Sequence, residues 1–425
     1  MTASMAKKQT RRRFQLLMVL LVTITIAYFD RVNITVLIAD TKFLTDLGIS
    51  GNPTQTGLLM TFFLIAYGVG NICLSGIGDY LGPRKAMIIA ILGWFVAMMV
   101  GGFASMFSVM LFSRFLLGLG EGLHFPMMNA FCRPWFPKQE KATANAVWFI
   151  GTSLAPAVGM PVFSWLVANH TWHFTFFVCA GIGILPLFFL WFYTADSPRE
   201  HKSISQAEID YIEAGIGKEE AVKEKGSFFT LLRKNFSLIT ANKVYWVMVV
   251  YYSIHNIVWW GLMTWLPTYL KNERGFSWSE MGFLASLPFI LGIVCKLAAG
   301  WLSDRIGRRA PFCIAAMAGT ASMLYLSITT TNNWHSATYI CVGMALLTPG
   351  APLSMTMLQE MLPKQVMALG TGLLNGISYI CASASPLIMG FTMSHLGGFS
   401  SALGLLIGSC VIGLVCATTL TLRKF

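Results

Sequence analysis

The chain has 425 residues, of which 55% are hydrophobic and only 11% are charged, and its mean hydropathy is +0.64. A soluble domain carries about 25% charged residues, so this composition excludes a soluble globular protein. The net charge of +12 reflects basic residues clustered in alternate short loops, which is typical of membrane topology and not of nucleic-acid binding. We therefore expect a polytopic membrane protein that binds no nucleic acid.

Apolar segments recur along the whole chain, each close to the length of about 20 residues that crosses a hydrocarbon core. We predict an all-α membrane protein with twelve transmembrane helices, in chain order at residues 15–39, 55–77, 85–105, 109–131, 143–167, 173–194, 243–270, 280–302, 311–330, 336–358, 367–392 and 399–421. The basic clusters "KKQTRRR", "GPRK", "RPWFPKQEK", "DRIGRR" and "LRK" fall in alternate loops, and the bias of Lys and Arg toward the cytoplasm places those loops inside. We expect a multi-pass protein of the plasma (inner) cell membrane with both termini in the cytoplasm.

Two sequence motifs each occur twice, and the two copies are separated by nearly the same number of residues, which we call the internal offset. This indicates an internal duplication. Asp79 in "GIGDYLGPRK" and Asp304 in "GWLSDRIGRR" are 225 positions apart, and Pro137 and Pro363 are 226 apart. Transporters built from two like-oriented repeats hold their substrate between the repeats, near the midplane. We divide the chain into a six-helix bundle at 1–194, a cytoplasmic central loop at 195–242 and a second, pseudo-symmetric six-helix bundle at 243–425.

Residues of opposite charge lie together inside two of the predicted spans. The stretch "AYFDRVNITV" places Asp30 beside Arg31 in the first span, and Arg114 and Glu121 are two helical turns apart on one face of the fourth. A charge at the bilayer centre costs about 2.5–3.5 kcal/mol on insertion scales, so such residues usually line a functional interior. A structural ion pair that joins the first and fourth spans through these four residues is one explanation. We favour a protonation switch that exchanges ion-pair partners, because buried ion pairs add little stability.

The loop "GWLSDRIGRR" resembles the signature of the major facilitator superfamily, and "YFDRVNI", "RFLLGLGEG" and "WFPKQEKATA" are similar to its anion:cation symporter branch. That branch takes up sugar acids and other organic anions, commonly with protons. The resemblance implies that Asp30 and Glu121 carry protons. It also implies that residues of the two related loops take part in gating: Asp79, Arg84, Asp304, Arg305 and Arg308. The first-half copy of the loop is degraded, with Tyr80 in place of the arginine.

The internal offset and helical spacing extend the site into the second half. The offset relates Asp30 to His255, which can exchange protons near neutral pH, and Asn71 to Lys296 in "FILGIVCKLAAG". Tyr67 with Asn71, and Asn375 with Tyr379, are i,i+4 pairs that each share one helix face. We predict that His255 joins the proton-coupling residues and that the substrate contacts are Arg31, Tyr67, Asn71, Arg114, Lys296, Asn375 and Tyr379.

Three further features bear on the substrate and on the transport movement. Met355 and Thr152 stand where some sugar-acid members of the family have a tryptophan and a glutamine, which leaves open whether the anion is a sugar acid. The tryptophans Trp259, Trp260 and Trp265 are most simply explained as an aromatic belt at the membrane interface. The break "LTPGAPL", residues 347–353, is expected to loosen the tenth span.

We therefore expect a secondary active transporter, not an enzyme, that takes up a small organic anion by proton symport as its two halves alternate access. The anion is a carboxylate, with a sugar acid or a related acid as the candidates. An antiporter that exchanges organic anions or exports a cation is the alternative, and a transporter-like sensor is a third reading. We expect no cofactor and no metal site, a proton as the coupling ion with sodium not excluded, and a monomer in the lipid bilayer.

Overall fold

The computed structural model describes residues 10–74, 81–216, 236–239, 241–362 and 366–423. The helices of the first half are α1 (Arg12–Leu37), α2 (Thr41–Asp46), α3 (Pro53–Cys73), α5 (Pro83–Gly102), α6 (Phe107–Trp135), α7 (Lys138–Phe149), α8 (Gly151–Asn169) and α9 (Trp172–Tyr193). The central interval contains η1 (Pro198–Glu200) and α10 (Gln206–Ile216). The second half contains α12 (Lys243–Thr268), η2 (Tyr269–Glu273), α13 (Trp278–Ile306), α14 (Ala310–Thr329), α15 (Asn333–Leu347), α16 (Gly350–Met361), α17 (Met367–His395) and α18 (Gly398–Leu422).

Each predicted span corresponds to one long helix or to two helices separated by a short break. The fifth span is α7 followed by α8, and the tenth is α15 followed by α16, with the expected break at Thr348 and Pro349. Proline removes a backbone donor, so a helix changes direction most readily at such positions. The all-α fold with twelve membrane helices is confirmed.

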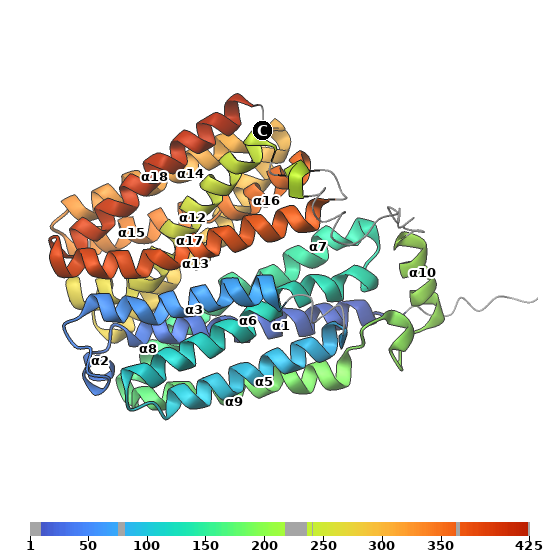
Figure 1. The fold of residues 1–425 in the computed structure, drawn as a ribbon, viewed down its shortest axis with the longest axis horizontal. Helices are drawn as coiled ribbons and strands as arrows, with labels where there is room; N and C mark the ends of the chain where they lie inside the picture. The colour runs from blue at the N-terminus through green and yellow to red at the C-terminus, as the bar shows by residue number, and fades with distance from the viewer. Residues whose placement is uncertain (1–9, 75–80, 217–235, 240, 363–365, 424–425) are drawn as a thin grey trace, which may run out of the picture.

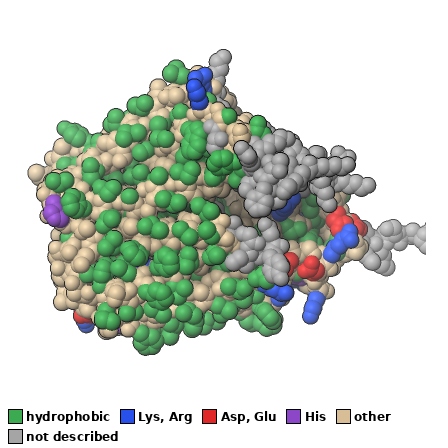
Figure 2. Space-filling model, in the orientation of Figure 1, with side chains coloured by type: hydrophobic (Ala, Val, Ile, Leu, Met, Phe, Trp, Pro, Cys, Tyr) green, Lys and Arg blue, Asp and Glu red, His purple; other side chains and the backbone are tan. Residues whose placement is uncertain are grey.

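The surface and the helix lengths agree with a multi-pass membrane protein. Ten helices in the described ranges are long and apolar enough to cross a membrane. α6 and α12, with 29 and 26 residues, are not among those ten but are as long. These two helices carry the predicted site residues Arg114, Glu121 and His255. In the face shown in Figure 2, hydrophobic side chains cover the middle of the molecule and most charged side chains lie at the end near α10.

Helices of the two halves occupy opposite sides of the molecule in Figure 1, blue to green below and yellow to red above. α3 packs against α17, and α8 packs against α13, so both contacts join one half to the other. The α3–α17 contact includes a hydrogen bond in which the Thr61 hydroxyl donates to the backbone oxygen of Ser383 at 2.7 Å. Side chains at the contact between α3 and α17 therefore lie at the interface of the two halves.

Glycines allow α3 and α6 to approach closely. A Cβ atom at Gly122 would lie 2.6 Å from the backbone oxygen of Tyr67, and one at Gly70 would lie 2.8 Å from that of Leu119. Small residues at such crossings let membrane helices pack backbone to backbone. This crossing fixes Tyr67 on α3 close to Glu121 on α6, which is next to Gly122 in sequence.

Candidate functional site

The centre of the site is a buried ion pair between α1 and α6. The Nε and Nη2 atoms of Arg31 donate to Oε2 of Glu121 at 2.6 and 2.5 Å. The two side chains are 3% and 1% exposed. In a medium that excludes water, a charge without a partner is strongly unfavourable, so each group depends on the other. The sequence marked both residues as functional but did not pair them with each other.

Aromatic rings from both halves surround the guanidinium of Arg31. Its central carbon lies 4.2 Å from the ring centroid of Tyr28, 5.1 Å from Phe63, 4.8 Å from Tyr67 and 5.6 Å from Trp260. Cations are attracted to aromatic faces at such distances. We call these four residues the aromatic cage. Because Trp260 belongs to α12, the aromatic cage contains residues of both halves.

Tyr379, one of the predicted residues of α17, lies next to the aromatic cage. The ring centroid of Tyr379 is 4.8 Å from that of Tyr67 and 6.1 Å from that of Trp260. Asn375, one turn earlier on α17, is half-buried, and its Oδ1 atom accepts no hydrogen bond from any described residue. The structure therefore brings Arg31, Glu121, Tyr67 and Tyr379 together.

Four polar atoms of the residues described above are buried without a hydrogen bond to any part of the chain that the structure describes. Two are donors, Nη1 of Arg31 and Nε1 of Trp260, and two are acceptors, Oε1 of Glu121 and Oδ1 of Asn375. Most buried polar groups in native proteins are satisfied, so a cluster of exceptions needs an explanation. Donors suit a carboxylate and acceptors suit hydroxyl groups, so the set matches a hydroxylated acid.

Asp30 and Arg114 are two further buried charged residues of the first half. Asp30 is 5% exposed and Arg114 is fully buried. The Nη2 atom of Arg114 donates to the Ser113 hydroxyl at 3.2 Å, and its guanidinium lies 5.1 Å from the ring centroid of Phe176 on α9. Its Nε and Nη1 atoms donate to no described group. Both predicted residues are thus buried inside the first half, and Arg114 has donors left for an anionic partner.

Lys296 contacts the first half directly. Its Nζ atom donates to the hydroxyl of Ser153 on α8 at 2.8 Å, and no described carboxylate forms an ion pair with it. An ammonium without an acidic partner in an apolar helix is costly unless a ligand or solvent neutralises it. The position therefore fits the predicted contact with an anion.

His255 packs beside the break in the tenth span. The ring is 3% exposed, its Nδ1 atom has no hydrogen-bond partner among the described groups, and it stacks on Tyr252 with centroids 6.0 Å apart. A Cβ atom at Gly350, the first residue of α16, would lie 2.7 Å from that Nδ1. Glycine at this position lets α16 approach His255 closely.

The last predicted substrate contact, Asn71, and the two positions that depart from the sugar-acid pattern have few described polar contacts. Asn71 is half-buried and lies at the α3–α6 crossing, where a Cβ atom at Gly122 would lie 2.8 Å from its backbone nitrogen. The Thr152 hydroxyl, near the start of α8, donates to the backbone oxygen of Phe149, the last residue of α7, at 2.9 Å. Met355 is half-buried among hydrophobic residues. Neither of the two departures from the sugar-acid pattern introduces a charge.

The predicted gating residues of the second half connect α13 to its neighbours. α13 ends at Ile306, and the next residue, Gly307, has a φ of 71°, a conformation that glycine favours. After this turn Arg309 donates to Asp304 at 2.9 Å and lies 3.1 Å from a carboxylate oxygen of Glu360 on α16. Arg308 donates to the backbone oxygen of Thr421 at 2.6 Å, and the Arg305 guanidinium lies 5.6 Å from the Trp301 ring.

The corresponding loop of the first half is partly described. Asp79 lies outside the described residues. Arg84 binds the end of α9: its backbone N–H donates to Asp196 at 2.7 Å, its Nε donates to the backbone oxygen of Leu190 at 3.2 Å, and its Nη2 donates to that of Trp191. Arg84 therefore ties the start of α5 to the segment that follows α9.

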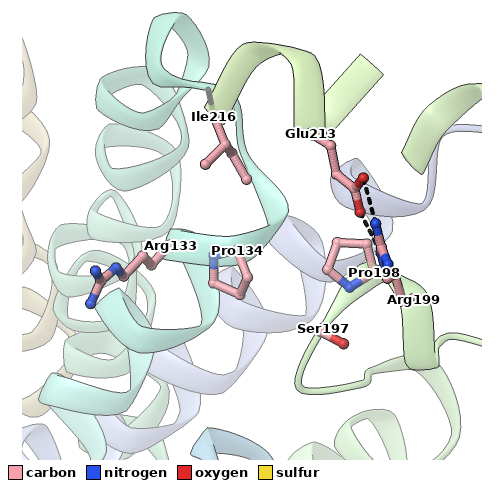
Figure 3. A pocket seen from close by; sticks show the side chains of 7 residues that line it. All are labelled: Arg133, Pro134, Ser197, Pro198, Arg199, Glu213 and Ile216. Carbon is pink, nitrogen blue, oxygen red and sulfur yellow. Dashed lines mark hydrogen bonds and ion pairs between the residues drawn. The ribbon is translucent and has the colours of Figure 1, made fainter. Parts of the chain in front are cut away.

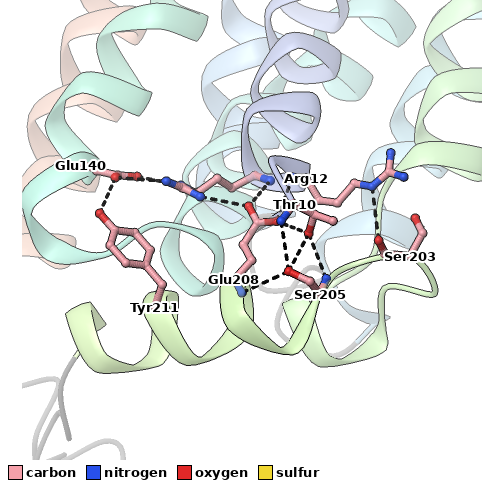
Figure 4. A network of polar contacts seen from close by, with 8 residues as sticks. Thr10, Arg12, Glu140, Ser203, Ser205, Glu208 and Tyr211 are labelled. Carbon is pink, nitrogen blue, oxygen red and sulfur yellow. Dashed lines mark hydrogen bonds and ion pairs between the residues drawn. The ribbon is translucent and has the colours of Figure 1, made fainter. Parts of the chain in front are cut away.

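A polar network at the end of the molecule near α10 was missed from the sequence (Figure 4). Glu208 on α10 is fully buried and accepts from the hydroxyl of Thr10 at 2.6 Å and from the backbone N–H groups of Arg12 and Arg13 at 3.0 and 3.2 Å. The Arg13 guanidinium donates to Glu208 at 3.0 Å and to Glu140 at 2.9 Å. A carboxylate at the first N–H groups of a helix stabilises its positive end, so α10 caps α1.

Replacing Glu208 with glutamine is expected to lower the free energy of unfolding by about 1.5–3 kcal/mol, the usual contribution of a hydrogen bond to a charged group. Glu213→Gln, in the same helix, is the matched control because Glu213 pairs with Arg199 at the surface, where the side chains are 43% and 74% exposed. Thermal unfolding in detergent measures both. Equal midpoints for the two variants would contradict a role for Glu208 in capping α1.

The same network predicts a loss of stability in acid. Partial burial disfavours the charged form of Glu140, but hydrogen bonds from Arg13 and Tyr211 outweigh it and lower the pKa of this carboxyl in the folded protein. A lowered pKa contributes stability above the carboxyl's unfolded value, and that contribution is lost as the pH falls through the folded value.

A cavity of about 450 Å³ lies at this same end, between α6 and α10 (Figure 3). Its lining includes Arg133, Ser197 and the Arg199–Glu213 pair, in which Arg199 donates to Glu213 at 2.5 and 2.8 Å. None of the predicted substrate contacts lines it. The cavity is therefore separate from the predicted substrate site.

A family model for the Major Facilitator Superfamily matches residues 20–386. The chain belongs to the major facilitator superfamily. It is similar to a D-galactonate transporter of Escherichia coli O6:H1, with 29% identity over 96% of this chain and 95% of that one. It is also similar to a probable sulfoacetate transporter of Cupriavidus necator, with 30% identity over 71% of this chain and 67% of that one. The solved structure of a bacterial homologue of the human lysosomal transporter Spinster, inward-facing and unoccupied, aligns with a TM-score of 0.76 and 15% identity over 97% of this chain and 96% of that one.

Family membership decides the general function. Major facilitators and these relatives are membrane transporters, so the prediction that the chain is a transporter and not an enzyme is confirmed. The assignment of the tryptophans to a membrane belt is wrong for two of the three. Trp260 and Trp265 are 1% and 3% exposed, so neither faces lipid. Trp260 is instead a member of the aromatic cage of this major facilitator.

Proposed function

We propose that this major facilitator takes up a small hydroxylated carboxylate, such as a sugar acid, together with protons. The observation that carries the proposal is the buried Arg31–Glu121 pair, enclosed by aromatic residues of both halves. A guanidinium binds a carboxylate through two parallel hydrogen bonds. An anion that competes with Glu121 for Arg31 would release the glutamate, which could then take up a proton.

The charges of the described residues support an anionic substrate. Arg31 has one donor to spare, Arg114 has two, and Lys296 has no acidic partner in the described part of the chain. The relatives named for D-galactonate and for sulfoacetate transport are both named for small organic anions. A second acidic group on the substrate would reach Lys296, which comes from the other half.

The roles of the remaining residues follow from this arrangement. Asp30, Glu121 and His255 carry or relay protons. Tyr67, Asn71, Asn375 and Tyr379 line the substrate. The two loop regions gate the cycle while the bundles 1–194 and 243–425 rock about the site. The protein acts as a monomer in the plasma membrane with both termini in the cytoplasm.

Uptake into proteoliposomes tests the proposal. The purified protein is expected to accumulate D-galactonate or another acid from a panel of organic acids when an inward proton gradient is imposed, and to accumulate less without the gradient. Liposomes without protein give the background. Uptake that ignores the gradient but requires an internal anion would replace symport with exchange. No uptake of any acid would contradict an organic-anion substrate.

A further inference from the structure

Trp260 is a buried tryptophan whose polar atom is unused. It lies on α12, is 1% exposed, and its indole N–H donates to no described group. Other buried tryptophans of the chain use theirs: Trp135 donates to the backbone oxygen of Ala195 at 3.1 Å, Trp172 to Asp46 at 2.7 Å and Trp265 to the backbone oxygen of Pro386 at 3.2 Å. A buried indole N–H normally has a partner because leaving it unpaired is costly.

The position of Trp260 indicates what the missing partner is. The Arg31 guanidinium lies 5.6 Å from the ring centroid of Trp260, and Arg31 also has one unused donor, Nη1. Two unused donors next to a buried positive charge suit one group that has two acceptor atoms and a negative charge. A carboxylate has that chemistry.

Packing requirements alone do not explain a tryptophan at this position. A phenylalanine would supply an aromatic face for Arg31 and for Tyr379, whose ring centroid is 6.1 Å from that of Trp260, without burying an unpaired donor. Trp94 has an unused N–H as well, but it packs edge-on against His124, with centroids 4.8 Å apart, and makes no described ring contact with Arg31. A ligand beside Arg31 would use the donor of Trp260.

We infer that the indole N–H of Trp260 donates a hydrogen bond to the carboxylate of the transported anion, beside Nη1 of Arg31. The inference rests on the proposed function and adds a specificity residue to it. Arg31 belongs to the first half and Trp260 to the second. A carboxylate held by both would join the halves at the substrate, so binding would favour the state in which they are closed over it.

The test compares two neighbouring tryptophans. Trp260→Phe keeps the aromatic face and removes only the donor, and it is expected to raise the Kd for D-galactonate, or for the best-transported acid of the panel, about 10- to 100-fold. Trp259→Phe is the matched control: its half-buried ring packs edge-on against Phe289 with centroids 5.9 Å apart, and its Kd is expected to equal that of the unmodified protein. Calorimetry of the purified protein measures Kd, and uptake separates KM from the maximal rate.

Two further measurements separate hydrogen bonding from packing. The unfolding midpoint without substrate should be alike for the two variants. Replacement of Trp260 by 3-benzothienylalanine, which has sulfur in place of the N–H, should reproduce the loss of affinity at unchanged ring shape, even if phenylalanine disturbs the fold. A benzothienylalanine protein with the original Kd would overturn the inference while leaving the proposed function intact. If the unmodified protein binds no acid of the panel, the proposed function and this inference both fail.

Discussion

Replacing Arg31 with glutamine is expected to reduce anion uptake by about 100-fold or more, because the substrate carboxylate loses the guanidinium that binds it, and truncating one partner of a buried charge pair costs roughly 2–5 kcal/mol. Arg31→Lys keeps the charge but loses the two-pronged geometry, so it should bind more weakly than the original protein and better than the glutamine variant. Initial rates in proteoliposomes measure the effect. Arg199→Gln, a surface arginine that also pairs with one glutamate, should transport normally.

A double substitution separates recognition from a purely structural ion pair. Arg31→Gln alone leaves Glu121 buried without its partner, and this variant is expected to be less stable. Arg31→Gln combined with Glu121→Gln removes both charges and should recover the unfolding midpoint. If Arg31 recognises the anion, the double variant stays inactive despite its stability. Recovery of uptake in the double variant would show that the pair is only structural.

The sequence predicted the fold well because the lipid environment imposes few and strong rules. Helices must satisfy their own backbone, and spans need a near-constant apolar length. The same rules made Arg31, Glu121 and Lys296 visible, since a charge inside an apolar segment is costly. Periodicity could not show that Arg31 and Glu121 pair, because the two lie 90 residues apart in the chain and their contact depends on how α1 and α6 pack.

Two features could not be predicted for a different reason. Trp260 was assigned to the membrane interface because tryptophan suits both an interface and a buried pocket, and only its burial on α12 distinguishes them. Glu208 lies in a polar interval where charged residues are common, so nothing in its surroundings marked it. Its role as a cap for α1 arises from contacts with Thr10, Arg12 and Arg13, almost 200 residues earlier in the sequence.

Neutral amides at Asp30 and Glu121 are expected to abolish proton-driven accumulation. A carboxyl that couples transport must bind a proton on one side of the membrane and release it on the other, which Asp30→Asn and Glu121→Gln cannot do. Accumulation of radiolabelled D-galactonate, or of the best-transported panel acid, against its gradient measures coupling. Counterflow, the exchange of external label for internal unlabelled anion, measures substrate movement without it. Glu213→Gln, which changes an exposed glutamate on α10, should leave both unchanged.

The two variants should differ in counterflow because the two acids have different partners. Oε2 of Glu121 accepts from Arg31, so Glu121→Gln weakens this interaction and leaves Arg31 free to bind the substrate. We expect counterflow to persist in Glu121→Gln at about the original Kd or below it. Asp30 has no described ion pair with Arg31, so Asp30→Asn does not release Arg31. This variant instead removes a buried charge from the half that contains the buried Arg114, and we expect its counterflow to be lower than that of Glu121→Gln. Full gradient-driven accumulation by both variants would place the proton path elsewhere, with His255 as the next residue to test.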